Sequence, residues 1–193
     1  MRDIFKASPV SGFEIEHLGA SPSALDAVSS FSVANNALGL ERYLKHEALP
    51  DEVSGDSRSY LVRDSENGEI ACYFSLRAGL ITISAGEGFF DTIPAIELAN
   101  FAVNQSYRKL HPTSRKIGAL VFDRFVLPIV AHVARYIGIQ CLYLYALPEP
   151  RLIAHYERLG FSRMPDADAA FIYSHVKPRY DAGCIFMYQY IAH

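Results

Sequence analysis

The sequence predicts a mixed α/β fold in which helices cover a sheet that contains one parallel crossover. The first observation is the dipeptide Asn67-Gly68 between two apolar runs, which is typical of a tight β-hairpin. The second is the order of three later segments, an apolar stretch over 95–103, an amphipathic stretch over 117–136 and an apolar stretch over 139–147. Strand, helix and strand in this order predict two parallel strands joined by a helix.

The first part of the chain is expected to supply a strand, two helices and the hairpin. Apolar and polar residues alternate from Phe13 to Leu18, which indicates a half-buried strand. After residue 38, apolar residues recur at helical spacing, which indicates an amphipathic helix. The expected elements are a strand over 13–18, helices over 24–33 and 38–48, a loop over 51–57, and hairpin strands over 58–63 and 69–76.

The rest of the chain is expected to complete the sheet. The stretch 95–103 is apolar on both faces except at Glu97 and Asn100, which favours a central strand covered on two sides. Pro128 should bend the helix over 117–136 or weaken one of its turns. The other expected elements are a polar, basic loop over 104–116, a strand over 139–147, a short helix over 150–160, a strand beginning at 161, a long connection over 165–183 and a final strand over 184–191.

Composition and charge narrow the class of protein. A chain of 193 residues, half of them hydrophobic, predicts one globular domain over 1–193. Its 18 Lys+Arg and 21 Asp+Glu give a net charge of −3, so a long nucleic acid is not expected as a partner. The longest apolar region, 125–147, is interrupted by His132, Arg135 and Gln140, and we expect a core helix and strand there and no membrane span.

The cysteines and histidines point to a cytoplasmic protein without a metal. Cys72, Cys141 and Cys184 are odd in number and far apart, which argues against disulfides and against a thiolate metal site. The seven histidines show no metal-ligand spacing. The N-terminal residues lack the apolar stretch of a secretory signal, and we therefore predict a cytoplasmic location.

The most informative stretch for function is the junction between the strand 95–103 and the following helix. Arg108, Lys109, Arg115 and Lys116 lie within ten residues that contain no acid. A helix N-terminus presents unpaired N–H groups and the positive end of the helix dipole, which together bind phosphate. A phosphate-binding loop and a solvated basic loop are both open interpretations of this stretch.

Three linked features resemble the GNAT superfamily of N-acetyltransferases, over about residues 58–191. The strand Glu97 to Val103, the polar loop and Lys116-Ile117-Gly118 look like the strand and pyrophosphate loop that bind acetyl-CoA in that family. The strand 139–146 would diverge from the strand 97–103. The run His155 to Phe161 is similar to the Tyr-x-x-x-Gly-Phe signature of the last helix. The resemblance implies a mostly antiparallel sheet with a splayed parallel pair, preceded by a first strand and helices in residues 1–57.

The same resemblance implies acetyl-CoA as co-substrate and assigns residues to it. The loop departs from the family pattern, because Lys116 stands at the central glycine in the best alignment and only Gly118 is kept. Glu149 replaces the asparagine that commonly precedes the signature tyrosine. The residues expected to bind the cofactor are Phe101, Ala102, Val103, Arg108, Arg115, Lys116, Ile117, Gly118 and Ala119.

Acetyl transfer to an amine needs a base and an acid. The amine must lose a proton before it attacks the thioester, and a partly buried carboxylate can take that proton. Glu97, the only acid between Asp91 and Asp123, matches the base of some family members, the alternative being a carboxylate paired with Arg or Lys. Tyr156 matches the acid that protonates the leaving thiolate, the alternative being a packing tyrosine.

Three functions are compatible with these features. The main expectation is transfer of acetyl to a primary amine of a small molecule or peptide, by direct attack in a ternary complex. A second is a toxin-like GNAT that acetylates aminoacyl-tRNA, supported by Leu40-Glu-Arg-Tyr-Leu-Lys45 and opposed by the acidic net charge. A third is a non-catalytic acyl-CoA-binding module, supported by the missing loop glycine. A homodimer and an antitoxin partner stay open, and Tyr173, His175, Lys177 and Arg179 are candidate acceptor contacts.

Overall fold

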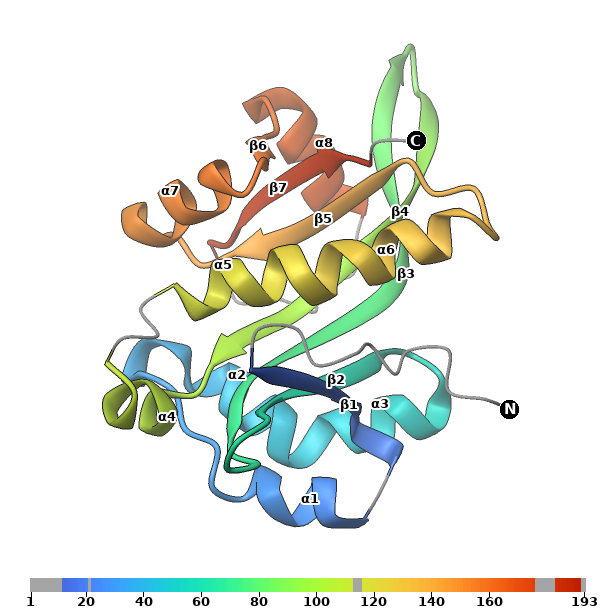
Figure 1. The fold of residues 1–193 in the computed structure, drawn as a ribbon. Helices are drawn as coiled ribbons and strands as arrows, with labels where there is room; N and C mark the ends of the chain where they lie inside the picture. Colours follow the sequence, from blue (N-terminus) through green and yellow to red (C-terminus); the bar gives the residue numbers. More distant parts are fainter. Residues whose placement is uncertain (1–11, 21, 113–115, 176–182, 192–193) are drawn as a thin grey trace. The chain divides into compact units, whose positions relative to one another are not determined.

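The computed structural model describes residues 12–20, 22–112, 116–175 and 183–191 (Figure 1). The chain divides into two compact units. Unit 1 holds residues 1–77 and 99–129, and unit 2 holds residues 78–98 and 130–193. The expectation of a single domain over 1–193 stays a prediction.

The strands form one mixed, seven-stranded sheet in the order β1-β2-β3-β4-β5-β7-β6. The pairs β1–β2, β2–β3, β5–β7 and β6–β7 are antiparallel, and β4–β5 is parallel. This confirms the predicted fold class, including the central position of β4. The strands are β1 (Phe13–His17), β2 (Arg58–Asp64), β3 (Ile70–Gly86), β4 (Phe89–Val103), β5 (Cys141–Ala146), β6 (Ser162–Arg163) and β7 (Ile185–Tyr190).

The parallel pair β4–β5 is short, as expected for splayed strands. Its register runs from Ala95 opposite Cys141 to Glu97 opposite Tyr143. Beyond this ladder β4 continues to Val103 and β5 to Ala146. The last paired position is therefore the one that carries Glu97.

The N-terminal helices of unit 1 differ from the sequence prediction in their bounds. The expected loop over 51–57 is wrong, because helix α3 continues to Ser54 and ends at Gly55, whose φ of 81° suits a residue without a side chain. Buried side chains of these helices and of the segment after α1 pack with β2 and β3. Phe31 of that segment meets the ring of Tyr73 edge to face at 5.2 Å. The helical segments are η1 (Leu18–Ala20), α1 (Pro22–Val28), η2 (Asn35–Ala37), α2 (Leu38–Arg42), η3 (Tyr43–Glu47) and α3 (Ala48–Ser54).

Both π-helical turns of unit 1 come shortly before a proline. In η3 the N–H of Ala48 donates to Tyr43 O, and Pro50 follows. In η4 (Phe122–Val126) the N–H of Leu127 donates to Phe122 O, and Pro128 follows. A helical proline cannot donate to the carbonyl four residues earlier and its ring collides with it, and a wider turn relieves that conflict. The predicted irregular turn at Pro128 is confirmed.

The segment expected to be a basic loop over 104–116 contains a helix, α4 (Gln105–Leu110). Asn104 caps it, because its side-chain oxygen accepts from the N–H of Ser106 at 3.1 Å. The loop prediction failed for a physical reason: six residues are too few to show a helical hydrophobic period. Arg115 and Thr113 lie outside the described residues.

The helix after the loop consists of α5 (Ile117–Val121), η4 and α6 (Leu127–Ala134), and it ends two residues before the predicted end. Among the described residues, Ile117–Ala134 is the one helix long and apolar enough to cross a membrane, judged by length and composition alone. Phe122 and Val126 within it are fully buried in the protein, as in a core helix. The absence of a membrane span stays a prediction.

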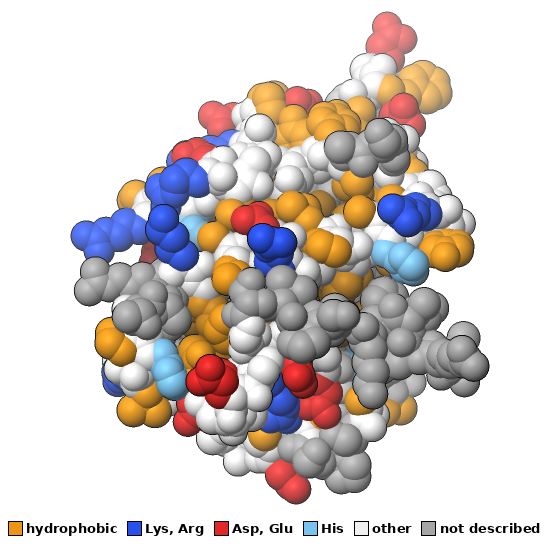
Figure 2. Space-filling view, in the orientation of Figure 1, with side chains coloured by type: hydrophobic (Ala, Val, Ile, Leu, Met, Phe, Trp, Pro, Cys, Tyr) orange, Lys and Arg blue, Asp and Glu red, His pale blue; other side chains and the backbone are white. Residues whose placement is uncertain are grey.

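Unit 2 contains the far part of the β3–β4 hairpin, β5, β6 and β7, and the helices α7 (Pro150–Arg158) and α8 (Asp166–His175). β4 begins at Phe89, earlier than the predicted 95, and the turn at Glu87 joins it to β3. Figures 1 and 2 show this end of the hairpin projecting, with hydrophobic and acidic side chains on it. Exposed Phe89 and Phe90 belong to it.

Helix α8 corrects the expectation of a plain connection over 165–183. Its Ile172 is buried against the sheet of unit 2. Tyr173 joins α8 to β7, because its hydroxyl donates to Cys184 O at 2.9 Å and accepts from Phe186 N–H at 2.8 Å. His175 is exposed at the end of α8, and Lys177 and Arg179 lie outside the described residues. The buried members of this core are Ile81, Ala95, Cys141, Tyr143, Ile172 and Phe186.

Candidate functional site

Strand β4 carries the predicted base and three of the predicted cofactor-binding residues. Glu97 lies in the part of β4 that belongs to unit 2, whereas Phe101, Ala102 and Val103 lie in the part that belongs to unit 1. Ala102 is buried, and the other three are half-buried. A strand with partly accessible side chains at these positions can contact a ligand and also belong to the core.

In unit 1, Asn104 fixes the start of α4 at the end of β4. Its side-chain oxygen accepts from the N–H groups of Ser106 and Ser32, and its amide donates to Ile70 O at 2.7 Å. Its own N–H donates to Ala71 O at 2.9 Å. Because Asn104 is 5% exposed and holds three chain segments together, it sets the direction in which the chain leaves the predicted cofactor strand.

A second buried contact in unit 1 anchors α4. Tyr107 Oη donates to Asp64 Oδ2 at 2.6 Å, and the other carboxylate oxygen accepts from Glu66 N–H at 2.9 Å. The Tyr107 hydrogen bond is the main cause of a lowered Asp64 pKa, and burial is the main cause of a raised Tyr107 pKa. His111 stacks on the Tyr107 ring at 4.2 Å and its Nε2 lies 3.1 Å from Glu69 Oε2.

The basic residues of the stretch 107–116 that the structure describes lie on the surface of unit 1. Arg108 and Lys109 are exposed in the last turn of α4. Lys116 is exposed at the N-cap of α5, where its carbonyl accepts the first helical hydrogen bond from Leu120 N–H at 3.0 Å.

The start of α5 combines small side chains with backbone N–H groups of a first helical turn. Ile117 is buried, while Gly118 and Ala119 are small and half-buried. The N–H groups of a first helical turn have no partner within the helix. An exposed lysine beside such N–H groups, with small side chains that do not cover them, is suited to a polyanion.

In unit 2, Glu97 has a partner that the sequence did not indicate. Tyr143 Oη donates to Glu97 Oε2 at 3.3 Å, and the two residues stand opposite each other in the β4–β5 ladder. The Tyr143 ring is 6% exposed and stacks on Phe186, with ring centroids 5.4 Å apart. It ends against Gly79 of β3, where a Cβ atom would lie 2.8 Å from Tyr143 Cε1.

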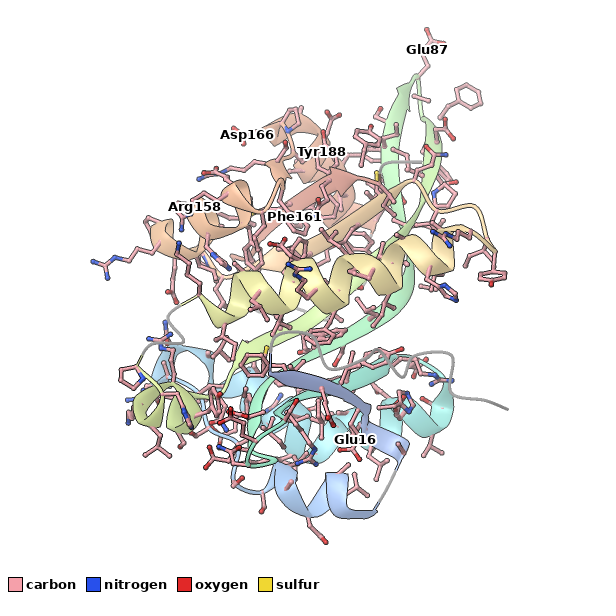
Figure 3. All side chains as sticks on the ribbon, in the orientation of Figure 1. Glu16, Glu87, Arg158, Phe161, Asp166 and Tyr188 are labelled. Atoms are coloured by element: carbon pink, nitrogen blue, oxygen red, sulfur yellow. The ribbon has the colours of Figure 1, made fainter. Side chains whose placement is uncertain are left out.

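Tyr156 lies near the C-terminal end of α7, where the helix is capped. Phe161 N–H donates to Tyr156 O at 3.1 Å and Gly160 N–H donates to Glu157 O at 3.1 Å, which are the two hydrogen bonds of a Schellman motif. Gly160 has a φ of 93°, and the rings of Tyr156 and Phe161 meet edge to face at 5.6 Å. The Tyr-x-x-x-Gly-Phe signature is therefore a helix C-cap, and its Phe161, labelled in Figure 3, packs on Tyr156.

Burial and charge shift the pKa of other titratable groups in unit 2. Burial, followed by the charge of Arg158, lowers the pKa of His155, and burial raises the pKa of the Cys141 thiol.

Within the part of the chain that the structure describes, no group of three or more His, Cys, Asp or Glu side chains could hold a metal ion. Cys72, Cys141 and Cys184 are free and buried.

The described members of the predicted cofactor set lie at the end of β4, in α4 and at the start of α5, all in unit 1. Both predicted catalytic residues lie in unit 2, and Arg115 lies outside the described residues. Sequence reasoning missed Asn104, Gly79 and Tyr143. Asn104 followed by Ser106 is a detectable capping signal, whereas Tyr143 can be matched to Glu97 only once the strand register is known.

No known family model matches the sequence. Among solved structures, the chain is similar to a tyrosine-to-phenylalanine mutant of KacT, with 15% identity, coverage of 93% of this chain and 95% of that chain, and a TM-score of 0.67. A tyrosine-to-phenylalanine mutant of the toxin AtaT, bound to the C-terminus of the antitoxin AtaR and acetyl-CoA, matches with 17% identity, 91% and 92% coverage and a TM-score of 0.64.

AtaT complexed with acetyl-methionyl-tRNAfMet matches with 17% identity, 81% coverage of this chain, 91% coverage of that chain and a TM-score of 0.63. At these identities the likeness establishes the fold, and the predicted GNAT fold is confirmed. The prediction against a nucleic-acid partner gains no support from neighbours that include a tRNA complex.

Proposed function

We propose that this protein is an acetyl-CoA-dependent N-acetyltransferase that works by direct transfer in a ternary complex. The observation that carries the proposal is Tyr156, fixed by the Schellman motif of α7 in a chain that has the GNAT fold. The fold by itself does not define a reaction, so the proposal depends on the side chains at these positions.

Glu97 and Tyr156 divide the two proton transfers between them. The Glu97 carboxylate takes the proton that the amine nitrogen loses as it forms a bond to the acetyl carbon. The carbon–sulfur bond breaks, and the Tyr156 hydroxyl gives its proton to the leaving thiolate. The products are the acetylated amine and coenzyme A, and solvent returns the proton from Glu97 to Tyr156.

Acetyl-CoA would supply the acetyl group, and the basic residues of unit 1 would bind its phosphates. Lys116 and the first-turn N–H groups of Gly118 and Ala119 are the proposed contacts, with Arg108 as a further cation. Neighbours of the same fold include AtaT bound to acetyl-CoA, which supports the choice of co-substrate.

The first test combines cofactor binding with acetyl transfer. Calorimetry should detect acetyl-CoA binding, and replacing both Arg108 and Lys116 by Ala should weaken it about tenfold, because each removes a charged contact. Arg42→Ala removes an exposed cation elsewhere in unit 1 and serves as the matched control. No binding at millimolar acetyl-CoA would refute the proposal.

Replacement of the two catalytic candidates tests the chemistry. Glu97→Gln and Tyr156→Phe should each lower kcat about 10²-fold to 10⁴-fold with unchanged acetyl-CoA affinity. If coenzyme A release with an accepted amine is unaltered in both variants, the assigned roles are wrong. Acetyl-CoA binding without transfer to any amine would instead favour a non-catalytic acyl-CoA-binding module.

The acceptor that we propose is the α-amino group of an aminoacyl-tRNA. One neighbour of this fold is AtaT in complex with acetyl-methionyl-tRNAfMet. Arg151 and Arg158 are exposed on α7, where Figure 2 shows Lys and Arg side chains gathered. Local cations of this kind can bind phosphates although the net charge of the chain is −3.

Labelled acetyl-CoA distinguishes the acceptors when it is offered with aminoacyl-tRNA, deacylated tRNA, peptides and polyamines. We expect label on aminoacyl-tRNA alone, with a rate that falls steeply as salt rises. Arg151→Ala with Arg158→Ala should raise KM for the tRNA and leave acetyl-CoA affinity unchanged. Label on peptides or polyamines and none on aminoacyl-tRNA would reject this acceptor while retaining the acetyltransferase.

A further inference from the structure

The neighbourhood of Glu97 in unit 2 contains a contact that the proposed mechanism does not use. Tyr143 extends from β5 across the neighbouring strand β4 to β3, which places its hydroxyl within hydrogen-bond distance of Glu97 and its hydroxyl and ring edge against Gly79. All three residues belong to unit 2. Three adjacent strands therefore contribute one residue each to a single contact.

We propose that Tyr143 is the positioning residue of Glu97, and that Gly79 is the gap in β3 that admits its ring. This inference rests on the proposed function, because it assigns Tyr143 a role through the Glu97 base. The hydroxyl donates to Oε2 at 3.3 Å, and a carboxylate can accept several hydrogen bonds on its two oxygens.

The Tyr143 ring is held on more than one side. It stacks on Phe186 at 5.4 Å and meets Tyr145 edge to face at 6.1 Å. Gly79 offers no side chain, and a Cβ atom there would lie 2.9 Å from Tyr143 Cζ, which is closer than carbon atoms pack. A ring fixed in this way keeps its hydroxyl at one place, which is what orientation of a base requires.

The hydrophobic cluster around Tyr143 contains four further titratable side chains. They are Cys141 and Tyr145 of β5, Tyr173 of α8 and Tyr188 of β7. Burial raises the pKa of both Cys141 and Tyr188 above their ordinary values of about 8.5 and 10. The ordinary pKa of a carboxylic acid lies below both values, so we assign a change in the acid limb of a pH profile to the proposed base.

The experiment compares Tyr143→Phe with wild type and with Tyr190→Phe, an exposed tyrosine of β7 that serves as the matched control. Tyr143→Phe keeps the stacked ring and removes only the donor. We expect kcat to fall about 10-fold to 100-fold, and the acid limb of the kcat profile to move to higher pH, because a carboxylate without its donor is easier to protonate. Unchanged kcat and pH profile, or a change in thermal stability alone, would overturn the proposal.

Gly79→Ala provides an independent route to the same effect. Its methyl group should push the Tyr143 ring away and lower kcat as much as Tyr143→Phe does. The kcat of the double variant should be no lower than that of either single variant. Additive losses would show that the two residues act separately and would contradict the proposal.

A readout without any acceptor separates this inference from the proposed function. Infrared difference titration of wild type against Glu97→Gln identifies the Glu97 carboxylate band, and Tyr143→Phe should move its titration to higher pH. A shifted band in a protein that transfers no acetyl group would support the contact and reject the function. An unshifted band would reject the contact whatever the activity.

Discussion

A tyrosine hydroxyl donates to a carboxylate in each unit, and the two pairs differ in geometry and surroundings. In unit 1, Tyr107 Oη and Asp64 Oδ2 are 2.6 Å apart and both residues are buried. In unit 2, Tyr143 Oη and Glu97 Oε2 are 3.3 Å apart and Glu97 is half-buried. The first pair is short and enclosed, whereas the second is long and partly accessible.

The difference separates a structural carboxylate from one suited to chemistry. Asp64 also accepts from Glu66 N–H, and its lowered pKa means that its charged form is stabilised by contacts within the fold. A carboxylate held in this way is a poor proton acceptor. The Tyr143–Glu97 contact is longer and Glu97 is half-buried, which suits the general-base role that we propose for Glu97.

The largest effect on stability should come from Tyr107→Phe. It leaves a buried carboxylate without its donor, and we expect the free energy of unfolding to fall by about 1–3 kcal/mol in urea titrations. Tyr143→Phe is the matched variant of the other pair and should lose less than about 1 kcal/mol. Equal losses would remove the distinction between the two pairs.

The carboxylates themselves give the next comparison. Asp64→Asn should lower the free energy of unfolding by about 1–2 kcal/mol, because it removes a charged hydrogen bond in a buried site. Glu97→Gln should stay within about 0.5 kcal/mol of wild type while it lowers activity. A stability loss for Glu97→Gln as large as that for Asp64→Asn would assign Glu97 a structural role.

The pH dependence of stability tests the same contrast with a defined sign. Since the pKa of Asp64 is lowered in the folded state, its contribution is present above the unfolded value of about 4 and is lost as the pH falls through the lowered folded value. Thermal unfolding between pH 7 and pH 2 should therefore show a smaller acid-induced decrease of Tm in Tyr107→Phe than in wild type. Parallel curves would mean that Tyr107 does not affect Asp64.

A small effect is also expected where a hydrogen-bonded His–Glu pair is accessible. His111 Nε2 and Glu69 Oε2 are 3.1 Å apart, with side chains 34% and 44% exposed. Glu69→Gln keeps the shape of the side chain and should lower the free energy of unfolding by less than about 1 kcal/mol. A larger loss in thermal or urea unfolding would show that this pair, and not Tyr107 alone, holds α4 in place.

Much of the fold could be predicted from local pattern. The hairpin at Asn67-Gly68, the apolar strands and the disturbed turn before Pro128 each depend on residues close in sequence, and the structure confirms them. The predictions failed where a helix was short or ran on past its expected end. Helix α4 lies within the expected basic loop, and helix α3 continues past residue 51 into the other expected loop. In both, tertiary packing and capping stabilise a helix whose own period is too short to detect.

The sequence by itself determined the fold class, the position of the base candidate on a central strand, and Tyr156 within a signature that closes a helix. Only the tertiary structure decided that Glu97 stands opposite Tyr143, that Gly79 leaves space for the Tyr143 ring, and that Asp64 meets Tyr107. The physical reason is that a side-chain contact between strands depends on register, and register follows from the packing of the whole sheet.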